Sequence, residues 1–297
     1  MRFADRIKSI APLGVGVSTE YGAGDTPGSL NVPAMHREQP GVIDFLEVGV
    51  EAAKGLDRHA LAWVEAGLPT TYHFLDINLD EPEDFTADWL ELVASLAAQL
   101  KTAYLCGDAG LWHFGPRDRG HMLLLPPILS AESAQDQARG IVRLRKELGY
   151  EVFPENPPGC VFLGDMHLMD YFAAVVDAAD TGLLLDCAHL AIYQHLKGYE
   201  PLEGLDRFPL DRVVEMHVAG GTHKEHEGFT FIEDDHTTEI LPATWQIFEY
   251  VCARAPNLKA VIFECERNSS QAVRPGFDRI RATVNDGPLG AAMGAAR

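Results

Sequence analysis

Short apolar runs rich in β-branched residues alternate along this chain with longer stretches whose apolar residues recur at helical spacing. Runs in which the odd and the even positions are both apolar are typical of parallel strands buried on both faces. Eight such runs occur about 35 residues apart on average, which matches the βα repeat of a (β/α)8 barrel. The predicted strands are Leu13–Val17, Ile43–Val48, Thr70–Leu75, Thr102–Cys106, Glu151–Pro154, Gly182–Cys187, Val213–Ala219 and Leu258–Cys265.

Several intervening stretches have the 3.6-residue periodicity of amphipathic helices. The clearest is Phe85–Leu100, for which Asp84 and Thr86 are candidate capping residues. The other predicted helices are Leu56–Ala66, Ser130–Leu148, Leu168–Ala179 and Trp245–Ala255. The two patterns together predict an α/β fold, a single TIM barrel over residues 1–285, because no Pro/Ser-rich linker divides the chain. Residues 286–297 are rich in Gly and Ala without periodicity, which predicts a disordered C-terminal tail.

The composition of the chain indicates which binding partners and which cellular compartment to expect. The chain of 297 residues has 24 Lys+Arg against 44 Asp+Glu, a formal net charge of −20. Such an acidic chain is not expected to bind nucleic acid or an anionic membrane, since both need clustered basic residues. No apolar stretch is long enough for a membrane-spanning helix. The 5 cysteines are scattered and form no CxxC pair, so we expect a reducing cytoplasm and neither a disulfide framework nor a structural zinc site.

Polar residues that can bind metal follow almost every predicted strand at its C-terminal end. In a parallel barrel all of these ends lie at the same face, which is where active sites form in this fold. Burying so many carboxylates and imidazoles together is costly unless cations compensate them. The residues are Glu47, His73, Asp108, His113, Glu155, Asn156, Asp186, His189, His217, Asp234, His236 and Glu264.

The spacing and chemistry of this set favour a multinuclear site. Asp234 and His236 are two residues apart, so extended backbone projects both side chains to the same side. Asp186 and His189 can converge across a strand-to-helix turn. Oxygen and nitrogen ligands without thiolate suit zinc, manganese or non-haem iron. The number of ligands exceeds the needs of one ion, which indicates two or three ions that share carboxylates.

Each residue also has a structural interpretation when it is taken alone. A histidine at a strand end is often only hydrogen-bonded, Asp186 can simply cap the following helix, and Asp234 can lie on a solvated loop. Asn156 can orient a ligand or substrate, or it can be a turn residue before Pro157. The agreement among so many strand ends favours metal binding for the set as a whole.

These residues resemble the multinuclear non-haem iron-dependent oxidative enzymes, a family formerly known only as a domain of unknown function. It includes the iron enzymes of methanobactin and thiaglutamate biosynthesis. The His-x-Ala-Gly step followed by Asp-x-His is the most specific part of the resemblance, which extends from Leu13 to Asn285. The segments that carry it are Phe45–Val48, Tyr72–Leu79, Glu155–Asn156, Leu184–His189, Glu215–Gly220, Asp234–His236 and Phe263–Glu264.

The resemblance implies a xylose-isomerase-like TIM barrel with metal ligands at His73, Glu155, Asp186, His189, His217, Asp234, His236 and Glu264. His189 stands where the family usually has Asn. The family commonly has Ser-(Asp/Glu)-His after strand 4, whereas this chain has Gly107-Asp108-Ala109 and then His113. Either His113 or Asp108 replaces the missing imidazole, or one metal site is altered. We count His113 among the expected ligands, Asp234 and His236 as catalytic, and Asn156 and Asp108 as candidate substrate contacts.

The activity implied by the resemblance is oxidation of a residue, often Cys, in a ribosomally made precursor peptide. Two or three Fe(II)/Fe(III) ions would act with O2 as co-substrate, and a partner protein would present the leader of the peptide. A Zn- or Mn-dependent hydrolase or sugar isomerase on the same barrel is the first alternative, and a non-catalytic binding protein is the second. The sequence leaves the substrate peptide and the oligomeric state open.

Overall fold

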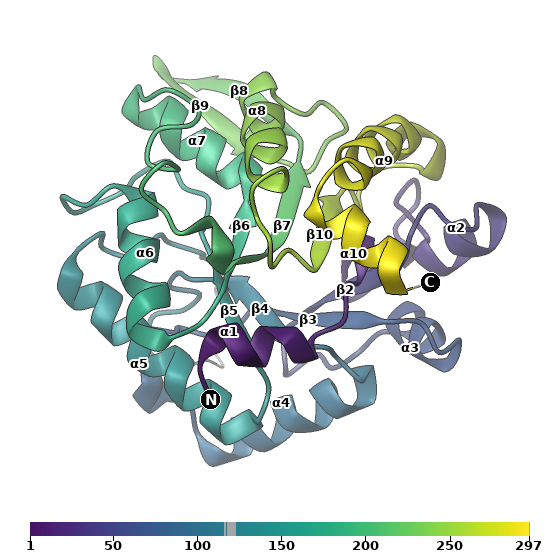
Figure 1. The fold of residues 1–297 in the computed structure, drawn as a ribbon, viewed down its shortest axis with the longest axis horizontal. Helices are drawn as coiled ribbons and strands as arrows, with labels where there is room; N and C mark the ends of the chain where they lie inside the picture. The colour runs from purple at the N-terminus through teal and green to yellow at the C-terminus, as the bar shows by residue number, and fades with distance from the viewer. Residues whose placement is uncertain (116, 118–122, 297) are drawn as a thin grey trace.

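The fold was determined as a computed structural model that describes residues 1–115, 117 and 123–296. Parallel strands close into a barrel in the order β1-β10-β7-β6-β5-β4-β3-β2, with helices around the outside (Figure 1). This arrangement confirms the predicted TIM barrel, and each predicted run overlaps one barrel strand. The strands are β1 (Gly14–Glu20), β2 (Phe45–Val50), β3 (Thr70–Phe74), β4 (Leu105–Asp108), β5 (Val152–Glu155), β6 (Leu183–Asp186), β7 (Val213–Ala219) and β10 (Ala260–Glu264).

All five predicted helices form, and Thr86, one of the two candidate capping residues, caps the helix that follows it. The hydroxyl of Thr86 accepts a hydrogen bond from Trp89 N, and that of Ser130 accepts one from Ser133 N. Helices α2, α7 and α9 were not predicted. In α7 the residues from Cys187 to Gln194 are all buried, so the helix has no polar face to give it a period. The helices are α2 (Val32–Glu38), α3 (Arg58–Glu65), α4 (Ala87–Leu100), α5 (Ala131–Leu148), α6 (Leu168–Ala179), α7 (Cys187–Lys197), α8 (Pro242–Cys252) and α9 (Ser270–Asn285).

The N-terminal end of the barrel is plugged by the first residues of the chain. Helix α1 (Phe3–Arg6) and the following 3-10 turn bury Phe3 and Ile7 against Tyr104 and Phe153 inside the barrel. Figure 1 shows α1 crossing this end of the molecule. The buried polar residues discussed below therefore lie between this apolar plug and the opposite, C-terminal mouth.

The prediction of a disordered tail at residues 286–297 is wrong for most of that segment. Helix α10 extends over Pro288–Ala296, and Leu289 is buried in the main core. A Cβ on Gly290 would lie only 2.6 Å from the backbone of Val284, so glycine permits this close approach to α9. The order of the helix thus comes from tertiary contacts that a Gly/Ala-rich sequence does not reveal.

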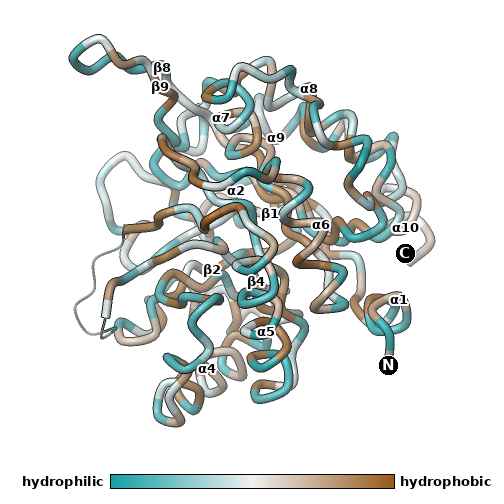
Figure 2. The backbone as a smooth tube through the Cα atoms, turned by 90° about the vertical axis from the view of Figure 1, so that its left-hand side faces the viewer, coloured by the Kyte–Doolittle hydropathy of each residue, from teal (hydrophilic) through white to brown (hydrophobic). Residues whose placement is uncertain are grey.

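A two-stranded antiparallel hairpin interrupts the βα alternation after β7. It consists of β8 (Gly221–His226) and β9 (Phe229–Asp234), and Figure 2 shows it projecting from the barrel. The hairpin carries the chain outward and returns it to the mouth at Asp234. Gly220, in the His-x-Ala-Gly step, permits this return because a Cβ there would lie 2.1 Å from the carbonyl oxygen of Thr237.

Candidate metal centre

A cluster of histidines and carboxylates occupies the C-terminal mouth of the barrel. It contains eight of the nine predicted metal ligands, together with Asp108 and Glu47. Most of these side chains are almost inaccessible to solvent, whereas Asp234 and His236 at the rim retain side-chain exposures of 15% and 20%. Three overlapping groups, which we name sites A, B and C, can be distinguished within the cluster.

Site A consists of His73, Asp108 and Glu155, at the ends of β3, β4 and β5. Nε2 of His73 lies 2.7 Å from Oε2 of Glu155. The sequence left open whether Asp108 or His113 replaces the family's histidine after strand 4. In the structure, the carboxylate of Asp108 belongs to this group. Asp108 is therefore a candidate ligand of site A.

Site B consists of Glu155, Asp186 and His217, with Glu264 beside them. Nδ1 of His217 lies 3.3 Å from Oε1 of both Glu155 and Glu264, and 3.8 Å from Oδ2 of Asp186. Asp186 also caps helix α7, because its Oδ1 accepts a hydrogen bond from the backbone N–H of His189. Oδ1 of Asp186 therefore caps the helix, while Oδ2 is the oxygen that can bind metal.

Site C is centred on Oδ2 of Asp234, which lies 3.0 Å from Nε2 of His189 and 3.3 Å from Nε2 of His236. Asp186, His189 and Glu264 also bring ligand atoms together here, which links site C to site B. His236 has a positive φ of 52°, a strained conformation that Asn268 supports by donating a hydrogen bond to its carbonyl oxygen. Glu266 holds the other ring nitrogen, Nδ1, at 2.8 Å.

The cluster fits metal ions because many of its polar atoms have no hydrogen-bond partner. Buried polar atoms are normally paired, and leaving them unpaired is costly. Within the described residues, the buried atoms without such a partner include Oδ1 of Asp108, Oε1 of Glu155, Oδ2 of Asp186, Nδ1 of His217, Oδ1 of Asp234 and Oε2 of Glu264. These atoms belong to all three sites, and each of them is an oxygen or nitrogen donor of the kind that iron, zinc and manganese accept.

The charges of the cluster shift its pKa values in the directions expected of an anionic cavity. Burial lowers the pKa of His73, but the neighbouring carboxylates, Glu47 foremost, outweigh it and raise that pKa to about 9. Burial raises the pKa of Asp186 to about 8. Burial also acts to raise the pKa of Glu155, yet the adjacent His217 and His73 hold it well below its usual range. In the metal-free chain, protons on histidine therefore provide the positive charge that metal ions would supply.

Two residues predicted for the site, His113 and Asn156, make other contacts in the structure. The prediction of His113 as a metal ligand is not supported, because its Nε2 faces Asp84 at 3.1 Å and its Nδ1 faces the carbonyl oxygen of Gly115 at 2.8 Å. Asn156 is not free to contact substrate. Its amide group donates to the carbonyl oxygen of Asp186 and accepts from the backbone N–H of the same residue, both at 2.9 Å. Asn156 therefore positions Asp186.

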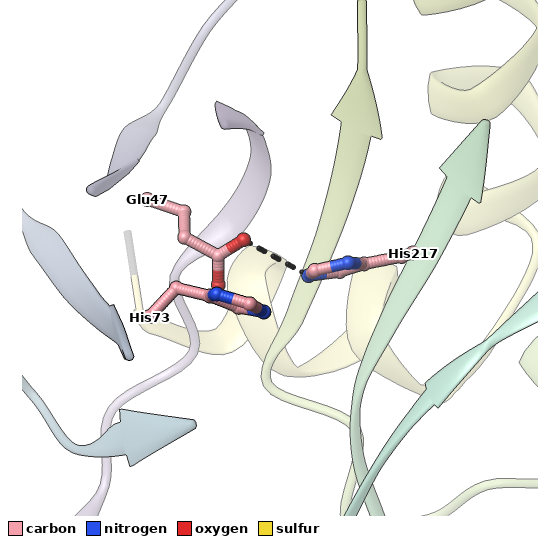
Figure 3. Close-up of side chains that lie close together, drawn as sticks. All are labelled: Glu47, His73 and His217. Atoms are coloured by element: carbon pink, nitrogen blue, oxygen red, sulfur yellow. Dashed lines mark ion pairs between the residues drawn. The ribbon is translucent and has the colours of Figure 1, made fainter. Parts of the chain in front are cut away.

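Glu47 extends the cluster toward the interior of the barrel, and the sequence marked it only as a strand-end residue. Its Oε1 lies 3.0 Å from Nε2 of His217, and His73 stands beside the pair (Figure 3). Carboxylates that face the second nitrogen of a metal-binding histidine orient the ring and raise its basicity. Glu266 has the same relation to His236. Glu266 lies two residues beyond the end of β10, so its position was a signal in the sequence, whereas Glu47 lies in the middle of β2.

A cavity of about 410 Å³ opens above the cluster and gives access to it. Ligands from all three sites line its floor, including Asp108, His189 and Glu264. Its walls include Trp112, Leu124 and Pro158, which follow β4 and β5. A substrate group of moderate size can therefore reach the metal-binding atoms between a polar floor and a partly apolar wall.

The pKa values predict how pH affects the metal-free protein. The folded chain holds a proton on His73 up to about pH 9, whereas the unfolded chain releases it near 6.5, so the free energy of unfolding should fall as the pH rises through this window. Asp186, with a pKa raised from 3.8 to about 8, acts in the same direction. Urea unfolding of metal-stripped protein at pH 6.5 and pH 9 measures the difference. An increase in the free energy of unfolding from pH 6.5 to pH 9 would contradict the raised pKa values of His73 and Asp186.

Replacement of Glu47 tests its relation to His217. Glu47→Gln should lower the affinity for metal by roughly 10- to 100-fold, as loss of a partner of a metal-binding histidine does. Competition with a coloured chelator measures this affinity without any enzymatic assay. Glu51→Gln is the control, because Glu51 lies near the same strand but pairs with Lys54 at the surface. Equal affinities of Glu47→Gln and the wild type would show that Glu47 does not support the site.

Comparison with known proteins places these observations in a family. The model of the family described as RiPP precursor modification enzyme MbnB/TglH/ChrH matches residues 29–281. The chain belongs to this family. RiPPs are ribosomally synthesised and post-translationally modified peptides, so membership confirms the resemblance that the strand-end residues indicated. A UPF0276 protein of Rhizobium meliloti is 25% identical over 84% of this chain and 82% of its own length, and one of Nitrosospira multiformis is 27% identical over 73% and 77%.

Solved structures support the same fold. The TTHB071 protein of Thermus thermophilus, studied after soaking with ZnCl2, has a TM-score of 0.54 and 16% identity, covering 92% of this chain and 98% of that one. A xylose isomerase domain protein of Planctomyces limnophilus has a TM-score of 0.53 and 11% identity over 93% and 98%. At these identities the likeness shows the barrel type alone, which is the predicted xylose-isomerase-like TIM barrel.

Proposed function

We propose that this member of the precursor modification family is a multinuclear non-haem iron enzyme that uses O2 to oxidise a residue, Cys being the first candidate, of a precursor peptide. The observation that carries the proposal is the set of three overlapping ligand groups, joined by Glu155 and Asp186 at the mouth of the barrel. Overlap through carboxylates is the arrangement in which two or three ions share ligands.

The residues present fit iron in both of its common oxidation states. Sites A, B and C offer imidazole nitrogens and carboxylate oxygens, which suit non-haem iron. Ala109 stands at the position of the family's histidine after strand 4, and Asp108 is the proposed ligand of site A from β4. The proposed ligand set is His73, Asp108, Glu155, Asp186, His189, His217, Asp234, His236 and Glu264.

Bound iron would supply the redox chemistry by activating O2, and the chain's own residues would supply binding and orientation. Asp234 and His236 lie at the rim, where a substrate group arrives first, so we assign them the catalytic roles. Trp112 and Leu124 provide an apolar wall of the cavity beside the substrate. His236 is held by Glu266 and Asn268, which keeps its Nε2 directed at Asp234.

The peptide and its delivery complete the proposal. The family description names a RiPP precursor as the object of modification, and the open cavity admits a side chain without enclosing a whole peptide. We therefore propose that a second protein binds the leader segment and presents the residue to be oxidised. The described residues include no helix long and apolar enough to cross a membrane.

Anaerobic reconstitution with Fe(II) tests the function. We expect two or three iron ions per chain, and O2 consumption only when a Cys-containing precursor peptide encoded beside the gene is added. Stoichiometric zinc without iron under these conditions, or hydrolysis or isomerisation independent of O2, would contradict the proposal. A protein that takes up no metal and keeps the same melting temperature in the presence of iron would indicate a non-catalytic binding protein, because a bound metal stabilises the fold.

A further inference from the structure

A second group of acidic side chains lies deeper in the barrel, and the proposed function does not use it as a unit. Glu47 of β2, Cys106 of β4 and Glu215 of β7 face one another there, and all three are buried. Tyr104, just before β4, is buried beside them. The apolar plug around Phe3 closes the space below this group.

The hydrogen bonding of this inner group is incomplete. The Cys106 thiol lies 3.2 Å from Oε2 of Glu47 and donates to it. Among the residues that the structure describes, neither carboxylate oxygen of the fully buried Glu215 has a hydrogen-bond partner, and the hydroxyl oxygen of Tyr104 also lacks one. A carboxyl group in such surroundings is stabilised by a proton, by a complete set of hydrogen bonds or by a cation. Burial raises the pKa of Glu215 to about 8, so a proton neutralises it in the metal-free chain, and a cation bound here would replace that proton.

We propose that Glu47, Cys106 and Glu215 form an inner metal site for a borderline divalent cation such as Zn²⁺, Fe²⁺ or Co²⁺. One ligand atom from each of the three residues lies within 4.8 Å of the others, which is compatible with one ion bound between them. A thiolate with two carboxylates suits such a borderline cation better than Mg²⁺ or Ca²⁺, which prefer oxygen alone. The Tyr104 hydroxyl, buried in the same cluster as Cys106 and unpaired among the described residues, is available to support the site.

The inner site differs from sites A, B and C in its ligands and in the effect that a bound ion would have. Its thiolate has no counterpart among the nitrogen and oxygen donors of the mouth. Strands β2, β4 and β7 are not neighbours in the barrel, so an ion here would cross-link three separated strands from the inside. Glu47 connects the two levels, since its Oε1 faces His217 while its Oε2 faces Cys106. Because the site is closed on all sides, we expect its ion to resist chelators that empty the mouth.

Cobalt reports on this site selectively, because cobalt–thiolate bonds give intense near-ultraviolet charge-transfer absorption that nitrogen and oxygen ligands do not. The full chain is produced in minimal medium with CoCl2, and its cobalt content and absorption are measured. We expect the charge-transfer band in the wild type. Cys106→Ser should lose the band and one cobalt ion per chain, and Glu215→Gln should lose most of that ion. Cys252→Ser is the control, since that buried thiol lies on α8 near the carbonyl oxygen of Thr283.

Several outcomes would overturn the proposal. One is wild-type protein that binds cobalt without the band; another is a band that persists in Cys106→Ser. If Cys106→Ser does not fold, X-ray absorption on wild-type protein decides, because an inner ion requires a sulfur neighbour at about 2.3 Å and its absence contradicts the site. The readout is independent of iron-dependent O2 consumption, so failure of the inner site and failure of the proposed function are separate results.

Discussion

Glu155→Gln should abolish activity and remove metal from both site A and site B. Glu155 is the carboxylate common to the two groups, with Oε2 at 2.7 Å from His73 and Oε1 at 3.3 Å from His217. Glutamine keeps the size of the side chain but loses its charge and replaces one oxygen by an N–H donor, which cannot bind a cation. The expected loss of turnover exceeds the roughly 100-fold that removal of an outer-shell partner of a metal ligand can cause.

Metal analysis and O2 consumption after anaerobic reconstitution measure this effect. Glu151→Gln is a matched control, because Glu151 lies just before the same strand, at the opposite end of the barrel, and pairs with Arg6 at 2.7 Å. The control should retain its full metal content and turnover. If Glu155→Gln also retained both, sites A and B would not be the metal centre.

Asp234→Ala should empty site C and stop turnover while leaving sites A and B occupied. Oδ2 of Asp234 is the atom common to His189 and His236, so its removal takes the central ligand from the site. Asp234 lies at the rim and ends a hairpin outside the barrel, so the barrel should still fold. The expected result is a loss of about one ion per chain and of O2 consumption with peptide.

His236→Ala should have the same effect, because it removes another ligand of site C. Glu233→Ala is the control, since Glu233 lies next to Asp234 on β9 but forms an exposed ion pair with Lys224. Circular dichroism of all three variants verifies the fold. Full metal content and turnover in both Asp234→Ala and His236→Ala would show that the catalytic assignment is wrong.

The sequence predicted the barrel well because its main signals are local. Apolar runs gave all eight strands, and Thr86 and Ser130 cap the helices that were expected to begin there. Local signals failed where order depends on distant contacts. Helix α10 lacks an amphipathic period and is held by burial of Leu289, and the β8–β9 hairpin has mostly exposed residues without the usual strand pattern.

For the candidate site, too, the sequence predicted what depends on position in a strand and missed what depends on distant contacts. The C-terminal ends of parallel strands meet at one mouth, so a residue's place at a strand end was enough to predict that Glu155, His217 and Glu264 converge. His113 lies in the long connection after β4, where sequence position does not fix direction, and the fold turns it toward Asp84. The choice between His113 and Asp108 was therefore beyond the sequence.

The sequence by itself determined the barrel and the mouth at which its polar residues gather, because the hydrophobic period and the strand-end positions encode both. The family came from the resemblance of motifs such as His-x-Ala-Gly and Asp-x-His, which the family model then confirmed. Only the tertiary structure decided which ring nitrogen of each histidine faces a carboxylate, that Asn156 holds the backbone of Asp186, and that Glu215 and Cys106 meet Glu47 inside the barrel. These relations join residues from strands far apart in the chain. They depend on the closure of the barrel and the rotation of each side chain, which no local pattern of residues records.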